Sequence, residues 1–286
     1  ATSIGWVTEV IQRAAASQER INDFLLLESE IKNTIDLQGY LSGDITFNNV
    51  YFTYKDTNTK ALKNIFLNIQ EGTTLGVFGK TGSGKSTIAN LICRFYDTKE
   101  GEIMFNKTNI KNLDLTALRS RIGYVPQDDY LFSGTIKDNI IFGSDVVEEK
   151  RILEAIKNAE IFEEINHLNN GLDTIIGERG VQLSGGQRQR LAIARVFYKN
   201  PEIFILDDCL SAVDANKERK ILKNLKRLSE GKTNIIISHR ISSIKDAYNI
   251  IVLDKGEIIE QGSHKDLLEK KGFYHTMYNN QSNKKV

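Results

Sequence analysis

The 286-residue sequence contains only two residues each of cysteine, proline and methionine. The two cysteines, Cys93 and Cys209, lie far apart and fit neither a disulfide framework nor a metal-binding cluster, so we expect a reducing compartment. The two prolines, Pro126 and Pro201, both fall at junctions between predicted segments. Neither methionine stands at the first position, so we expect a fragment or a processed product of a longer protein.

The sequence also lacks a charge excess and a long apolar run. Its 38 Lys and Arg residues against 37 Asp and Glu residues give a formal net charge of +1. Nucleic-acid-binding proteins usually carry a clear basic excess, so we expect no nucleic-acid partner. No apolar run approaches the ~20 residues that span a bilayer, and no segment resembles a signal peptide. A hydrophobic content of 40% and a charged content of 26% are typical of a folded globular protein.

The first 35 residues have helical periodicity. Apolar side chains recur every three or four positions, at Ile4, Val7, Ile11, Ala14, Ile21 and Leu25. This spacing predicts a long amphipathic helix. The periodicity leaves two alternatives open: the helix packs on its own domain, or its apolar face belongs against a partner that this sequence lacks. Residues 38–43 then predict a linker.

From residue 44 onward, strand-like and helix-like segments alternate. Apolar alternation predicts strands at 44–54 and 62–70, and a β run at 74–78 enters a glycine-rich turn. Further strands are predicted at 101–105, 121–125, 202–206, 233–237 and 249–253, with a hairpin partner at 257–260. Helices are predicted at 85–95, 114–120, 148–158, 186–199, 215–228, 241–246 and 264–270. This order is typical of an α/β domain with a largely parallel sheet.

A phosphate-binding loop follows the β run at 74–78. It fits the pattern G-x-x-x-x-G-K-[ST] in the strand–loop–helix context that the pattern requires. Glycines let backbone N–H groups point at phosphate oxygens, and the helix N-terminus adds partial positive charge. We expect Lys85 to reach the β- and γ-phosphates of a nucleotide and Ser86 to ligate Mg²⁺. The predicted binding residues are Gly79, Lys80, Thr81, Gly82, Ser83, Gly84, Lys85, Ser86 and Thr87.

A second acidic contact for Mg²⁺ is predicted at Asp207, which ends the apolar segment Ile203–Leu206. A carboxylate at the carboxyl edge of a strand in an open α/β sheet lies at the ligand crevice. Taken alone, Asp207 could equally cap the next turn. The phosphate-binding loop favours the metal-binding interpretation.

A second motif, Leu183-Ser184-Gly185-Gly186-Gln187, distinguishes this sequence from other proteins that have a phosphate-binding loop. A serine and two glycines at the start of a helix make a second anion site. Here the sequence resembles the ATP-binding-cassette (ABC) family, whose signature LSGGQ opens a helix. The resemblance implies that Ser184, Gly185, Gly186 and Gln187 bind the nucleotide held by a second cassette, so that two cassettes enclose two ATP molecules. It excludes in practice a nucleotide kinase that shares only the phosphate-binding loop.

Other positions match the family pattern within roughly residues 44–280. Tyr54 resembles the aromatic residue that stacks on adenine, and Gln127 resembles the glutamine that touches Mg²⁺ and the attacking water. His239 resembles the switch histidine that contacts the γ-phosphate, and residues 211–214 resemble the loop that crosses the dimer interface. The resemblance thus implies ATP and Mg²⁺ as ligands, with the metal held by Ser86, Gln127 and Asp207.

Residues 177–180 resemble a short loop found in exporters, in which each polypeptide has a membrane domain followed by a cassette. This implies that residues 1–35 are the cytosolic end of the last transmembrane helix and its linker, and that residues 36–286 are the nucleotide-binding domain. The implied fold is a P-loop α/β core, with an antiparallel β subdomain near residues 44–75 and a helical subdomain near residues 128–200. The domain would sit at the cytoplasmic face of a membrane, and the missing transmembrane domain of the same polypeptide would be a partner.

The sequence departs from the family pattern at Asp208, where a glutamate normally polarises the attacking water. Asp is one methylene shorter, which withdraws the carboxylate by roughly 1.5 Å, whereas a general base must lie within about 2.6–3.2 Å of its partner. Cys209 and Leu210 also replace the usual small and hydroxyl residues. One hypothesis is a degenerate site that cleaves ATP slowly, as in heterodimeric exporters. The alternative is a conservative replacement with nearly full activity. The retained His239 argues mildly against full degeneracy.

We therefore predict the ATP-hydrolysing motor domain of an ABC exporter, with Asp208, His239 and Gln127 as catalytic residues. ATP binding would close two cassettes, as a homodimer or a heterodimer, and hydrolysis would release them. One alternative is a slow regulatory ATP clamp within a heterodimeric transporter. Another is a soluble ABC ATPase acting on nucleic acid, which the balanced charge opposes.

Overall fold

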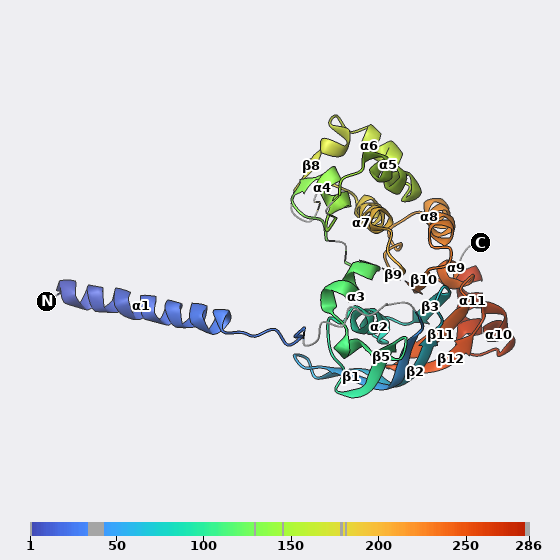
Figure 1. The fold of residues 1–286 in the computed structure, drawn as a ribbon, viewed down its shortest axis with the longest axis horizontal. Coiled ribbons are helices and arrows are strands. Elements are labelled where there is room, and N and C mark those ends of the chain that lie inside the picture. The colour runs from blue at the N-terminus through green and yellow to red at the C-terminus, as the bar shows by residue number, and fades with distance from the viewer. Residues whose placement is uncertain are drawn as a thin grey trace. The chain divides into compact units, whose positions relative to one another are not determined.

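The computed structural model describes residues 2–33, 43–128, 130–144, 146–177, 180 and 182–283 (Figure 1). The chain divides into two units, residues 1–32 and 33–286, which are described separately. The predicted boundary between residues 35 and 36 lies outside the described residues, as do most of the predicted linker and Glu178 and Arg179 of the exporter-like loop.

The first unit consists of one helix, α1 (Thr2–Leu25), where the periodicity predicts one. Large apolar side chains along it are exposed, including Trp6, Ile11 and Phe24. The described part of this unit contains no second helix or strand on which they could pack. Across the described residues of the whole chain, no helix is both long and apolar enough to cross a membrane.

An antiparallel sheet begins the second unit. Its strand order is β2-β1-β4-β5, formed by Thr59–Ile69 (β2), Ile45–Tyr54 (β1), Glu100–Phe105 (β4) and Thr108–Asn109 (β5). In the strand β1, Phe47 lies opposite Leu67 of β2 and Ile103 of β4. These three side chains are buried and share a core with helix α2 (Lys85–Ile92), so the sheet packs against the helix that follows the phosphate-binding loop.

A six-stranded sheet forms the centre of the unit, with the order β12-β11-β3-β10-β9-β6. All neighbours pair in parallel except β12, which is antiparallel to β11. Ile237 at the end of β10 lies opposite Val77 of β3 and Asp207 of β9. The loops that follow these strands therefore meet at one edge. The strands are Glu257–Gly262 (β12), Asn249–Asp254 (β11), Thr74–Gly79 (β3), Thr233–Ile237 (β10), Ile203–Asp207 (β9) and Ile122–Val125 (β6).

Four helices gather at one end of this unit (Figure 1), in the region predicted to be a helical subdomain. They are α4 (Ile136–Ile141), α5 (Glu149–Asn158), α6 (Phe162–Asn166) and α7 (Gly185–Lys199). The other helices are α3 (Leu115–Arg121), α8 (Ala215–Leu228), α9 (Ile241–Ile244), α10 (His264–Glu269) and α11 (Phe273–Asn283). Short elements are the 3₁₀ turns η1 (Ile110–Asn112) and η2 (Gly171–Asp173), and the strand pair β7 (Gly134–Thr135) and β8 (Ile175–Ile176).

Successive side chains of the central strands enter two different cores. On β9, Phe204 and Leu206 pack with the helical subdomain, whereas Ile203 and Ile205 pack with α2 and the antiparallel sheet. This division follows from the two-residue period of a strand. Both faces of the sheet are buried, which explains why β9 reads as a continuous apolar run rather than an alternating one.

Most predicted elements are present, with small shifts at their ends. The helix predicted at 85–95 ends at Ile92, because Arg94 has a φ of 49°, a left-handed conformation that ends helices. The sequence analysis missed α4, α6, α11 and the short strands β5, β7 and β8. Helices of five or six residues are too short to show a period. Helix α11 contains three Asn residues and one Ser, which have low helix propensity.

We expect Ile205→Ala to lower the free energy of unfolding by about 2–5 kcal/mol, because it leaves a cavity at a fully buried position of the central sheet. Urea unfolding measures this loss. The matched control is Ile259→Ala on β12, where the side chain is 46% exposed and the expected loss is below about 1 kcal/mol. Equal losses for the two variants would contradict the packing described here.

Candidate active site

A cleft of about 230 Å³ opens where the loops after β3, β6, β9 and β10 meet. The structure places eleven predicted residues at its walls: Tyr54, Thr81, Gly82, Gly84, Lys85, Ser86, Thr87, Gln127, Asp207, Asp208 and His239. Thr59 and Ala61 also line it, although no motif in the sequence pointed to them. The predicted residues Gly79, Lys80 and Ser83 belong to the same loop but do not line the cleft.

The phosphate-binding loop fits its surroundings closely at two glycines. A Cβ atom on Gly84, whose φ is 102°, would lie 2.4 Å from the carbonyl oxygen of Ala61. A Cβ atom on Gly79 would lie 2.4 Å from the carbonyl oxygen of Leu253 in β11. Gly84 also gives α2 no side-chain cap, so the first N–H groups of that helix remain available to an anion.

Lys85 folds back over this loop. Its Nζ atom donates hydrogen bonds to the carbonyl oxygens of Gly79 at 2.9 Å and Lys80 at 2.8 Å. Burial lowers the pKa of Lys85, and the negative charges of Asp208 and Asp207 oppose that shift. The loop therefore presents a partly desolvated cation, which gains from a phosphate group brought beside it.

Asp207 ends β9 and is 1% exposed. The Tyr124 hydroxyl donates to its Oδ2 atom at 3.3 Å, while Oδ1 is buried without a hydrogen-bond partner among the described residues. Burial raises the pKa of Asp207, and hydrogen bonds from Ser86 and Tyr124 lower it. A buried carboxylate oxygen that lacks a partner is suited to holding a cation.

The residues predicted to hold Mg²⁺ fit that ion. Ser86, Gln127 and Asp207 all line the cleft and all offer oxygen atoms. The described part of the chain holds no group of three or more His, Cys, Asp or Glu residues that could bind a metal alone. Magnesium is usually held by one or two carboxylates, waters and the phosphates of a substrate. The donor set therefore suits an ion that arrives with a nucleotide.

Asp208 and His239 form a direct pair. The Nδ1 atom of His239 lies 2.7 Å from Oδ1 and 2.9 Å from Oδ2 of Asp208. A carboxylate only accepts hydrogen bonds, so Nδ1 carries the proton and the other ring nitrogen is left for the cleft. Asp208 has a left-handed φ of 47°, and its N–H donates to the carbonyl oxygen of Ile237 at 2.9 Å. The sequence analysis named both residues but missed their contact.

Tyr54, at the end of β1, and Gln127, after β6, both line the cleft. The Tyr54 hydroxyl lies 3.1 Å from Thr87 Oγ1, and its ring packs edge-on against Phe52 at 4.9 Å and Tyr96 at 5.3 Å. Gln127 follows β6 and is exposed. Tyr54 is thus held in place by α2 and its aromatic neighbours, whereas Gln127 is free to meet a ligand.

The signature residues do not line this cleft. Ser184 caps α7: its hydroxyl accepts from the N–H of Gln187 at 3.3 Å, and Gln187 Oε1 accepts from the N–H of Ser184 at 2.9 Å. The next glutamine, Gln189, donates to Ser211 Oγ at 3.2 Å and accepts from the N–H of Ala212 at 2.9 Å. The signature helix is therefore joined to the loop at 211–214, apart from the nucleotide cleft of its own chain.

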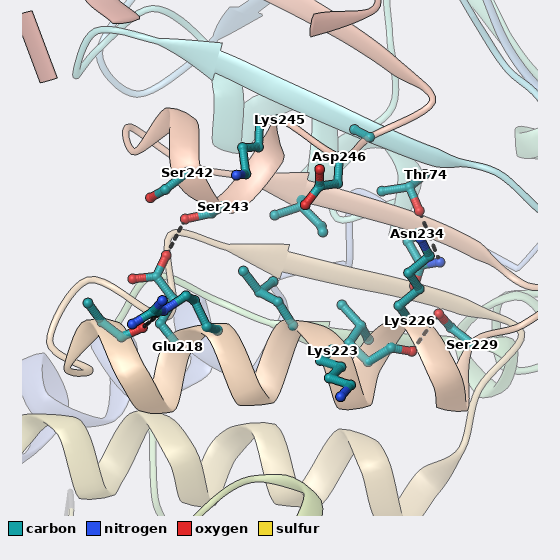
Figure 2. Close-up of a pocket in the computed structure, with 16 residues that line it drawn as sticks. Thr74, Glu218, Lys223, Lys226, Ser229, Asn234, Ser242, Ser243, Lys245 and Asp246 are labelled. Atoms are coloured by element: carbon teal, nitrogen blue, oxygen red, sulfur yellow. Dashed lines mark hydrogen bonds between the residues drawn. The ribbon is translucent and has the colours of Figure 1, made fainter. Parts of the chain in front are cut away.

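A partly buried ion pair involves Arg240, the residue after His239. Arg240 donates to Glu218 Oε2 at 2.7 Å and to the carbonyl oxygen of Ser211 at 2.7 Å. Glu218 of α8 also accepts a hydrogen bond from Ser243 of α9, as Figure 2 shows in the groove between these helices. Arg240 thus ties the loop after β10 to α8 through Glu218 and to the loop at 211–214 through the Ser211 carbonyl oxygen, and no motif in the sequence indicated either contact.

We expect Asp207→Asn to stabilise the nucleotide-free chain near pH 7. The folded state holds the Asp207 proton more tightly than the unfolded chain, so stability falls as the pH rises from 3.8 towards the raised folded-state pKa and stays lower above it. Removing the carboxylate removes that loss, and the difference should shrink towards pH 4. Urea unfolding at several pH values measures it.

The matched control is Asp246→Asn, at an exposed aspartate, which should change stability little at any pH. A lower stability of Asp207→Asn at pH 7 would mean that hydrogen bonds to this carboxylate outweigh the effect of its burial.

Known proteins resemble this chain in sequence and in fold. A family model described as ABC transporter matches residues 62–211. The chain is 44% identical over 282 residues to a probable multidrug resistance ABC transporter ATP-binding/permease protein of Bacillus subtilis, covering 98% of this chain and 48% of that protein. It is 43% identical over 267 residues to an ATP-dependent lipid A-core flippase of Pasteurella multocida, covering 91% of this chain and 45% of that protein.

A solved structure of a bacterial Atm1-family ABC exporter with ATP bound matches with a TM-score of 0.90 and 37% identity, covering 97% of this chain and 49% of that one. The chain spans about half the length of the known relatives it matches. The α/β P-loop fold predicted from the sequence is confirmed by this likeness. The chain belongs to the ABC transporter family and is an ATP-binding domain of that family.

Proposed function

We propose that the chain is the ATP-hydrolysing motor domain of an exporter, in which ATP binding closes two cassettes and so drives export. The observation that carries this proposal is the single cleft where the phosphate-binding loop, Asp207, Asp208 and His239 meet. Two relatives named as a multidrug transporter and a lipid A-core flippase support export rather than import.

ATP would lie with its adenine against Tyr54 and its phosphates on residues 79–87. Lys85 would neutralise charge on the β- and γ-phosphates, and the N–H groups of the loop would bind phosphate oxygens. Ser86, Gln127 and Asp207 would hold Mg²⁺, which stabilises the charge that develops on the transferred phosphate.

Asp208 would accept the proton of the attacking water, as the general base. Nδ1 of His239 donates to Asp208, and its other ring nitrogen is left for the γ-phosphate. The contact between the two side chains thus has two effects. It orients His239 towards the cleft, and it holds the Asp208 carboxylate in place.

A second cassette would complete the site. Ser184 is exposed at the start of α7 and does not line the cleft of its own chain, so its hydroxyl and the adjacent glycine N–H groups are available to a nucleotide on another chain. The bonds from Gln189 to Ser211 and Ala212 would carry this contact to the loop at 211–214.

A membrane domain of the same polypeptide would receive the motion, and the chain would lie at the cytoplasmic face of a membrane. Phe132 and Phe142 stack at 4.1 Å with the Arg195 guanidinium beside both rings, and these two rings and Tyr130 stay exposed. An exposed aromatic group close in sequence to Gln127 suits a docking surface for another domain. The exposed apolar side chains of α1 fit the cytosolic end of a transmembrane helix.

A slow regulatory clamp within a heterodimeric transporter is a second candidate, favoured by Asp208. Both oxygens of this shortened carboxylate contact His239, which leaves it poorly placed to act as a base. On this hypothesis the chain's own site holds ATP, while its LSGGQ completes a fast site on a different subunit. The names of the relatives do not favour the nucleic-acid alternative.

We expect Asp208→Glu to raise the rate of ATP hydrolysis by on the order of a hundredfold, because the longer side chain returns the carboxylate to the distance at which it can bind the attacking water. The measurement is phosphate release at high protein concentration. Lys85→Ala provides the blank, because it removes the cation of the phosphate-binding loop.

A parent chain near the blank, with activity restored by Asp208→Glu, would support the degenerate site and a catalytic partner subunit. A parent chain that already hydrolyses ATP well, and gains little from the substitution, would contradict the slow clamp and favour a homodimeric exporter.

We expect Ser184→Arg to abolish ATP-dependent dimerisation, because a long cation at the start of α7 blocks the opposing phosphate-binding loop. Light scattering with and without MgATP measures the dimer, and a fluorescent ATP analogue measures binding to the single chain. Ser120→Arg, at an exposed serine of α3, is the control and should dimerise like the parent. A dimer of unchanged strength in Ser184→Arg would contradict the proposed head-to-tail arrangement.

A further inference from the structure

Helix α11 contacts two loops of the nucleotide site although none of its residues lines the cleft. At its start, the ammonium group of Lys80 in the phosphate-binding loop lies 5.3 Å from the centre of the Phe273 ring. Near its end, Gln281 bonds to the loop that carries His239. The helix therefore runs from the loop after β3 to the loop after β10.

The amide of Gln281 holds the backbone on both sides of Arg240. Its Nε2 atom donates to the carbonyl oxygen of His239 at 2.7 Å, and its Oε1 atom accepts from the N–H of Ile241 at 2.9 Å. Arg240 stands at the cap position of α9 and provides no side-chain cap. Gln281 thus supplies the acceptor that the first N–H of α9 lacks within its own segment.

Helix α11 is itself firmly anchored. Tyr274 is fully buried, and its ring lies 5.8 Å from that of Phe78, the residue before Gly79 on β3. Glu260 of β12 accepts from the N–H groups of Phe273 and Tyr274 at the start of the helix. Gln281 therefore projects from a helix fixed to the strand that leads into the phosphate-binding loop.

We propose that Gln281 is a positioning residue, which holds the switch loop so that His239 stays on the Asp208 carboxylate and faces the cleft. Asp208 is the only hydrogen-bond partner of the His239 ring among the described residues, and the His239 side chain is 51% exposed. Its place therefore depends on its backbone. Small displacements of a catalytic group cost large factors in rate. The kinetic consequence rests on the proposed ATPase function, whereas the structural consequence does not.

The first test is amide hydrogen exchange at Ile241 in the nucleotide-free chain. Gln281→Ala removes the acceptor, so the exchange rate of this N–H should rise by roughly tenfold. Gln281→Glu keeps an oxygen in place and should leave the amide largely protected. The matched control is Asn279→Ala, which removes an amide on the same helix whose side chain contacts only His275 among the described residues.

The second test is steady-state ATP hydrolysis with Asp208→Glu as the common background. Gln281→Ala should lower kcat by roughly tenfold with little change in KM, because it displaces a group that acts in the transition state. The kcat of Gln281→Glu should lie between those of Gln281→Ala and the background. Its carboxylate still accepts from the N–H of Ile241 but repels the carbonyl oxygen of His239. Asn279→Ala should match the background.

Unchanged exchange at Ile241 in Gln281→Ala would overturn the proposal, as would equal effects of Gln281→Ala and Asn279→Ala. Faster exchange with an unchanged kcat would reduce Gln281 to a structural contact and would also overturn it. A background that hydrolyses no ATP would instead be a failure of the proposed function. In that case the exchange rates of the three variants still decide whether Gln281 holds the switch loop.

Discussion

The parallel pairing of β10 between β3 and β9 is the constraint on which the site depends. Ile237 lies opposite both Val77 and Asp207, so β9 and β10 end in one row and β3 ends two residues beyond it. The phosphate-binding loop, the two acidic residues and the switch loop all lie at or just beyond this row. A slip of one residue would exchange the side chains that β10 sends to its two cores, which the buried faces forbid. Packing far from the cleft thus sets the geometry inside it.

The cleft holds two groups that are costly to keep without a ligand. Burial lowers the pKa of Lys85 and raises that of Asp207, so the protein disfavours the charge on each. The opposite charges of Lys85 and Asp207 offset these costs only in part, because Asp207 Oδ1 has no hydrogen-bond partner among the described residues. Magnesium would satisfy the carboxylate, and phosphate would satisfy the ammonium. In the proposed function, a nucleotide and its metal would relieve both costs together.

Local chemistry made much of the site predictable from the sequence. The glycines of residues 79–84 and the apolar run before Asp207 are patterns within one segment, and each pattern implies its own conformation. Tyr54, Gln127 and His239 have no such pattern, so only the family resemblance singled them out. The contacts of Gln281 with the switch loop and of Arg240 with Glu218 escaped prediction. They join segments far apart in the chain, and nothing in either segment indicates the other.

Asp208 departs from the family pattern, whereas the signature LSGGQ matches it. What this combination means depends on which nucleotide each motif serves. In the proposed dimer each ATP is held by the loop of one chain and the signature of the other, so the two motifs of one chain serve different nucleotides. Here the signature keeps its capping box and its link through Gln189 to the loop at 211–214. The substituted residue, Asp208, belongs to the chain's own site. In a homodimer both sites would carry it, and both would be slow. In a heterodimer the same substitution slows one site and leaves the partner's site complete. An intact signature in the same chain as the shorter Asp208 side chain is therefore what the slow-clamp hypothesis would require of a subunit with an unlike partner.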